Sequence, residues 1–169
     1  SYNTALGAGA LFSNSTGANN VAVGLEAMRN TTGGNSTCIG YKAMREATGS
    51  NNVAVGAESM LVTTSGTQDV FVGMFSGKAL TTGTNCTGVG YSALDEVTTG
   101  SENTSLGSAA GGAVTTGTSN TFIGYLSGTY AVGNTTGSGN VILGAYSRGS
   151  TAGASYANAI GYDINGAAG

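Results

Sequence analysis

A short motif recurs along the whole chain at a nearly constant spacing. It reads Asn-x-x-(Leu/Ile/Val)-Gly, and its closing glycines are separated by 16 or 17 residues, and once by 20. These glycines are Gly7, Gly24, Gly40, Gly56, Gly73, Gly90, Gly107, Gly124, Gly144 and Gly161. Ten units therefore cover residues 1–169 as a single repeat domain. The fold must repeat one structural unit about ten times.

The two parts of each unit differ in how much their length varies. A second glycine, usually preceded by Thr, lies seven residues before the closing glycine in eight of nine units. The other part spans nine or ten residues and rises to thirteen in the unit that contains residues 129–134. A strand paired with its neighbours needs a fixed length, whereas a loop tolerates insertion. We therefore expect a strand just before each closing glycine.

The residue types in that segment favour a strand. The residue before the closing glycine is always aliphatic, and the residue three before it is Thr or Val in nine units. Gly, Thr, Ser and Asn, which fill the rest, are poor helix formers. The sequence predicts an all-β, parallel β-solenoid of about ten coils of 16–17 residues. The expected internal core ladder is Leu6, Val23, Ile39, Val55, Val72, Val89, Leu106, Ile123, Leu143 and Ile160.

Polar side chains also recur at fixed positions. Asparagine opens most motifs, and stacked amides can form hydrogen-bond ladders between coils, with ligand contact as the alternative. The expected ladder consists of Asn3, Asn20, Asn52, Asn103, Asn120 and Asn140, with Asp69 and Ser36 as substitutes at the same position. Glu26, Lys42 and Glu58 share the second position after the closing glycine, so we expect charges of alternating sign to pair up the stack.

Composition excludes several functions. A net charge of −3 with only five Lys and Arg residues argues against nucleic-acid binding. The chain has no His, which excludes a Ser-His-Asp triad and His metal ligands. No segment approaches the ~18 apolar residues of a membrane span. Cys38 and Cys86 lie three coils apart, roughly 14 Å, too far for a disulfide. We expect no enzyme activity, catalytic residue, cofactor, metal site or membrane insertion.

The repeats resemble those of two kinds of surface protein. Asn20–Gly24 and Asn52–Gly56 both read Asn-Val-Ala-Val-Gly and resemble repeats in the heads of trimeric autotransporter adhesins. The longer unit, Asn-Thr-Ala-(Val/Leu)-Gly-x-x-Ala-Leu followed by Thr-Thr-Gly, resembles repeats of phage tail fibres and bacterial surface proteins. The resemblance implies a left-handed β-roll, a homotrimer and an extracellular, cell-surface or virion location. The adhesin-head repeat is shorter, so the coil cross-section is expected to differ.

The sequence thus predicts a structural fibre or filament protein with adhesion as a second role. A strand without charge on either side is expected to be covered on both sides, by the coil interior and by a partner chain. This favours a homotrimer over a thin monomeric solenoid, and the unshielded ends are expected either to continue into a longer solenoid or to stack head to tail into filaments. The alternative is a carbohydrate-binding or carbohydrate-processing solenoid. Candidate residues for recognising a host glycan or protein, unless they only cover a corner or seam, are Tyr130, Tyr41, Tyr91 and Tyr125.

Overall fold

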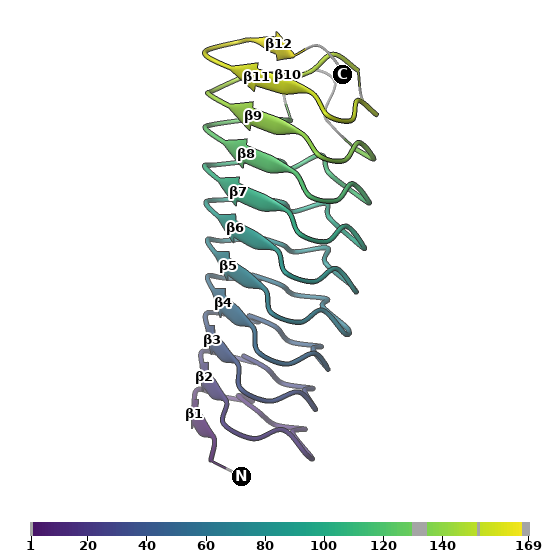
Figure 1. Cartoon of the computed structure of the whole chain (residues 1–169). Helices are drawn as coiled ribbons and strands as arrows, with labels where there is room; N and C mark the ends of the chain where they lie inside the picture. Colours follow the sequence, from purple (N-terminus) through teal and green to yellow (C-terminus); the bar gives the residue numbers. More distant parts are fainter. Residues whose placement is uncertain (1, 130–134, 152, 167–169) are drawn as a thin grey trace.

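The described part of the chain is a rod of stacked coils. The computed structural model describes residues 2–129, 135–151 and 153–166, and within them it contains strands, turns and bends but no helix. The strands succeed one another from β1 at one end to β11 and β12 at the other (Figure 1). The predicted all-β parallel β-solenoid is confirmed, with about nine turns joining its ten stacked strands.

One three-residue strand precedes each closing glycine. All ten strands pair in parallel, so that equivalent motif positions face one another, as in Ala5 with Ala22. The sheet contains β1 (Thr4–Leu6), β2 (Val21–Val23), β3 (Thr37–Ile39), β4 (Val53–Val55), β5 (Val70–Val72), β6 (Thr87–Val89), β7 (Thr104–Leu106), β8 (Thr121–Ile123), β9 (Val141–Leu143) and β11 (Asn158–Ile160). A second, two-stranded sheet pairs β10 (Arg148–Gly149) with β12 (Asn165–Gly166).

The corner after each strand explains the invariant glycine. Gly90, for example, has a φ of 137°, and a Cβ there would overlap the carbonyl oxygen of Gly107 in the next coil. Ser92 and Leu94, two and four residues beyond Gly90, also have positive φ values of 50° and 52°. Their N–H groups donate in opposite directions along the stack, to Met74 O (3.0 Å) and Ala110 O (3.1 Å). The left-handed conformation, although strained at about 1–2 kcal/mol per residue, thus joins each coil to both neighbours.

The expected core ladder is wrong as to which side of the strand faces inward. The central residue of each three-residue strand points into the coil, and from β2 to β9 and in β11 it is buried, as at Ala22, Cys38 and Phe71. The residues before the closing glycines point outward, because successive side chains in a strand alternate between faces. Those outward residues are Leu6, Val23, Ile39, Val55, Val72, Val89, Leu106, Ile123, Leu143 and Ile160, all exposed or half-buried.

The true core is narrow and has complementary side-chain volumes. In the coil of β4, the small Ala54 shares the interior with Met60, four residues after the closing glycine. The coil of β5 reverses this arrangement, with Phe71 in the strand and Gly77 at the later position. A Cβ at Gly77 would lie 2.7 Å from Phe71 Cδ1, and one at Gly88 in the next coil 2.5 Å from it. A phenylalanine in the strand therefore requires glycine at the later position of its coil, as Gly77 follows Phe71 and Gly128 follows Phe122.

Candidate functional site: an exposed aliphatic face

The outer side of the ten-stranded sheet forms the candidate site, which we call the aliphatic face. It consists of the first and last residues of each strand, which are aliphatic or Thr apart from Asn158, and none of them is charged. The parallel register aligns the last residues as a column along the rod, as in Val89 with Leu106 and Leu106 with Ile123. Figure 1 shows these strands stacked along one side of the rod.

The last residues of these ten strands are exposed or half-buried, unlike the residues of an ordinary core. Leu106 is 50% exposed, Ile123 39% and Leu6 67%, while Ser105 and Phe122, the central residues of β7 and β8, are buried. Parallel sheets are usually covered on both faces, and large contiguous apolar patches on a soluble chain mark interaction surfaces. The geometry of this face therefore fits an extended apolar partner running parallel to the rod.

Large side chains border the aliphatic face just beyond the closing glycines. Three of the four predicted recognition residues, Tyr41, Tyr91 and Tyr125, lie there and are exposed, together with Tyr162. Tyr125 and Tyr162 each contact Tyr146 edge-to-face, with ring centroids 5.3 and 5.6 Å apart. The fourth candidate, Tyr130, lies outside the described residues. These rings widen the apolar surface and present partly open aromatic faces.

The predicted asparagines lie on the inner side of the sheet. Asn103 is typical: its Oδ1 accepts the main-chain N–H of Asn120 (3.1 Å) and its Nδ2 donates to Gly117 O (2.8 Å). The same two kinds of bond recur along the row, and the last three asparagines add amide-to-amide contacts, from Asn120 Nδ2 to Asn103 Oδ1 (3.0 Å) and from Asn140 Nδ2 to Asn120 Oδ1 (2.8 Å). The row from Asn20 to Asn140 is buried. These side chains therefore hold adjacent coils together and cannot reach an external ligand.

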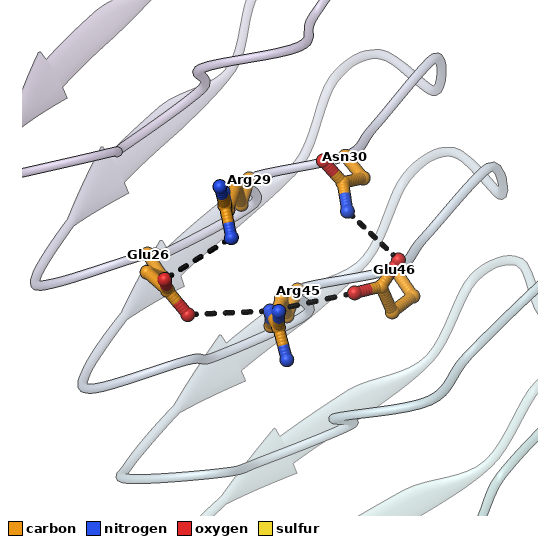
Figure 2. A network of polar contacts seen from close by, with 5 residues as sticks. All are labelled: Glu26, Arg29, Asn30, Arg45 and Glu46. Atoms are coloured by element: carbon orange, nitrogen blue, oxygen red, sulfur yellow. Dashed lines mark hydrogen bonds and ion pairs between the residues drawn. The ribbon is translucent and has the colours of Figure 1, made fainter.

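Charged side chains gather at one corner, two to six residues beyond the closing glycines. Glu26 binds Arg29 of its own coil (3.2 Å) and Arg45 of the next coil (3.3 Å), and Arg45 also meets Glu46 (3.4 Å). Asn30 Nδ2 closes the group by donating to Glu46 Oε2 (3.0 Å), as Figure 2 shows. Partly exposed pairs of this kind contribute at most about 1 kcal/mol each. The network helps to keep two coils in register.

The expected alternation of charge takes a different form. Lys42 lies over the ring of Tyr41, with 4.8 Å from Nζ to the ring centroid, so its charge is held mainly by an aromatic face. Glu58 instead pairs with Lys78 of the following coil (2.9 Å). The repeat position of a charged residue does not predict its partner, because long side chains can reach other positions of the neighbouring coil.

Both cysteines are buried and free, which confirms the prediction that they form no disulfide with each other. Burial raises the pKa of Cys38, and it raises the pKa of Cys86 to about 11. Since the thiolate is the reactive form, both thiols are poor nucleophiles and poor metal ligands in the folded rod.

The surface elsewhere offers no concave site among the described residues. That part of the chain contains no pocket and no group of three or more His, Cys, Asp and Glu residues able to hold a metal ion. Residues 2–129, 135–151 and 153–166 also include no helix long and apolar enough to cross a membrane.

Comparison with family models, with curated proteins and with solved structures gave no match to this chain.

Proposed function

We propose that this chain is a structural rod of an extracellular fibre or filament, on a virion tail fibre or a bacterial surface, in which three copies pack their aliphatic faces together. The observation that carries the proposal is the uncharged, half-exposed aliphatic column along the sheet. A solenoid of this kind has no reaction to perform. Its work is to span distance and resist bending.

The energetics of the aliphatic face support self-association. Complete burial of a Leu or Ile side chain contributes about 1.5–3 kcal/mol, so burying the open half of Leu106 contributes about 1 kcal/mol. Because the column repeats in every coil, several such contributions add along the rod, enough to offset the entropy of association. Identical columns are complementary to one another when the copies run parallel about a common axis.

The number three comes from the resemblance described above. Asn-Val-Ala-Val-Gly repeats, present here at Asn20–Gly24 and Asn52–Gly56, are similar to those of trimeric adhesin heads. A threefold arrangement also places each aliphatic face toward the axis and leaves the charged corner of Glu26 and Arg45 in solvent. That division of apolar and charged surface is typical of obligate oligomers.

Adhesion to a host glycan is the second candidate function. It is favoured by the exposed rings of Tyr125 and Tyr162, the latter 73% exposed, which Tyr146 holds in a fixed edge-to-face arrangement. Rigid aromatic rings supply contact area at low entropic cost. A glycan array with the intact protein, repeated with Tyr162→Ala, distinguishes an adhesive rod from a passive spacer.

Light scattering tests the self-association directly. We expect the wild-type chain to have three times the 16.4 kDa mass of one copy. The double variant Leu106→Glu/Ile123→Glu should have the mass of one copy and keep the β-sheet circular dichroism, because these side chains are outside the coil. The matched control is Thr99→Glu/Thr116→Glu, at two exposed positions outside the sheet, which should stay trimeric. A wild-type chain that is a single copy at micromolar concentration would contradict the proposal.

A further inference from the structure

Most side chains of the buried asparagine row make the same pair of bonds. The carboxamide oxygen accepts a main-chain N–H from the next coil, and the amide nitrogen donates to the carbonyl of a glycine, generally fourteen residues later. Asn52 Nδ2 donates to Gly66 O (2.9 Å) and Asn103 Nδ2 to Gly117 O (2.8 Å). The row thus needs an acceptor atom and a donor atom from each side chain.

Asp69 occupies this row with a carboxyl group. Its main-chain N–H donates to Asn52 Oδ1 (2.9 Å), and its own Oδ1 accepts the main-chain N–H of Cys86 (2.8 Å). The acceptor half of the pattern is therefore complete. Its Oδ2 is buried and makes no hydrogen bond. The fourteen-residue spacing assigns Gly83 as the glycine carbonyl that Oδ2 should meet.

The glycine next to this row shows that Oδ2 stands where other coils place the amide nitrogen. A Cβ built at Gly100 would meet two atoms first, Gly117 O and Asn103 Nδ2, the latter at 3.0 Å. A Cβ built at Gly66 would meet Gly83 O at 2.7 Å and Asp69 Oδ2 at 2.8 Å. Beside Gly100, the amide donor of Asn103 lies with its acceptor, the carbonyl oxygen of Gly117. Beside Gly66, two oxygens take these places, Oδ2 of Asp69 and the carbonyl oxygen of Gly83.

The surroundings of Asp69 offer no charge to neutralise it. Among the described residues, no Lys or Arg forms an ion pair with it. The titratable neighbour is Cys86 in the next coil, whose neutral thiol is directed to Gly100 O (3.3 Å). Asn52 in the preceding coil is neutral, and the buried hydroxyl of Thr63 makes no hydrogen bond to Asp69. A buried carboxylate facing a carbonyl without a partner is strongly disfavoured.

We propose that Asp69 is a protonated acid in the folded rod, that its Oδ2–H donates to the carbonyl of Gly83, and that loss of this proton weakens the joint between the coils of β5 and β6. Burial raises the pKa of Asp69 to about 7, and the N–H of Cys86 only partly opposes that rise. The folded chain therefore holds the proton more tightly than the unfolded chain, whose carboxyl has its ordinary value of 3.8. Stability then falls as pH rises from about 4 to about 7 and is level above that range.

The size of the effect follows from those two values. Between pH 5 and pH 8 this carboxyl alone should raise the unfolding equilibrium constant about 100-fold. Asp69→Asn restores the amide donor, so the variant should lack this part of the pH dependence and should be more stable than the wild type at pH 8. This inference does not depend on the number of copies in the assembly, because Asp69 lies inside one coil.

The test combines unfolding with a direct titration. Urea unfolding at pH 5 and pH 8 compares the wild type, Asp69→Asn and the control Glu102→Gln, whose side chain is exposed. The control should keep the wild-type pH dependence. In the wild type, the 13C resonance of the Asp69 carboxyl should titrate near pH 7. A midpoint near pH 4, or the same pH dependence in Asp69→Asn as in the wild type, would overturn the proposal.

Discussion

Exchanging the volumes of Phe71 and Gly77 tests the packing rule of the coil interior. Phe71→Ala leaves a cavity in a fully buried position, which costs about 3–5 kcal/mol in comparable cores. Gly77→Met alone forces a side chain onto Phe71, because even its Cβ would lie 2.7 Å from Cδ1 of that ring. Overpacking of this kind costs about 1–3 kcal/mol or more.

The double variant Phe71→Ala/Gly77→Met reproduces the pair found one coil earlier, Ala54 and Met60. Met60 has a φ of 52° and Gly77 a φ of 60°, so the backbone at position 77 already suits Met in the same way. The remaining defect of the double variant is a cavity beside Gly88, because the ring of Phe71 fills that space in the wild type. We expect the double variant to lose about 2 kcal/mol, against a sum of at least 4 kcal/mol for the single variants.

A double-mutant cycle measured by urea unfolding gives the coupling energy between the two positions. We expect it to favour the double variant by about 2 kcal/mol or more. Losses that simply add would refute the inference that these positions share one volume. Circular dichroism of each variant should confirm that the solenoid has formed before the unfolding data are compared.

Three further outcomes follow from the contacts between coils. Asn103→Ala removes three buried hydrogen bonds and should cost about 3 kcal/mol in urea unfolding, whereas the exposed Asn85→Ala should cost about 1 kcal/mol or less. Gly90→Ala should lower the unfolding free energy by about 3 kcal/mol or more, since its Cβ overlaps a carbonyl. Gly9→Ala, with a positive φ but only ordinary contact between the new Cβ and Glu26 (3.6 Å to Cγ), should cost only about 1 kcal/mol. Glu26→Gln should lower the unfolding free energy, measured by thermal denaturation, by less than about 1 kcal/mol, and the loss should be smaller in high salt.

The repeat spacing was sufficient to predict the solenoid, its strand positions and the pairing of equivalent residues. A parallel strand cannot shift by one residue without exchanging its two faces, so the constant seven-residue spacing fixes the register. The closing glycines from Gly7 to Gly144 follow from the same stacking, because each of them approaches the backbone of the next coil.

Which face of the strand points inward could not be read from hydrophobicity, because both faces lack charge. The aliphatic residues before the glycines are the larger set, as in Leu106 and Ile123, and large apolar side chains usually form the core. The narrow coil instead selects small residues for its interior wherever Met fills the opposite limb, as in Ala54 with Met60. The pairing of Phe71 with Gly77 and Phe122 with Gly128 was the available signal, since only residues that share a cavity need to compensate in volume.

Other features of the site depend on distances that a sequence does not contain. The choice of partners by Glu26 and Glu58 depends on side-chain reach between coils, and the pairing with Arg45 and Lys78 is visible only in three dimensions. The position of Asp69 in the asparagine row was evident from the repeat, but its unpaired Oδ2 was not.

Oxidative cross-linking of Leu106→Cys tests most directly whether the aliphatic face joins copies of the chain. The two native cysteines are buried and should stay free. If the faces meet at a common axis, cysteines at position 106 of different copies lie close together, and mild oxidation should give covalent dimers on a non-reducing gel. The control Thr116→Cys, exposed outside the sheet, should remain a single chain. Dimers from Thr116→Cys and none from Leu106→Cys would contradict the account.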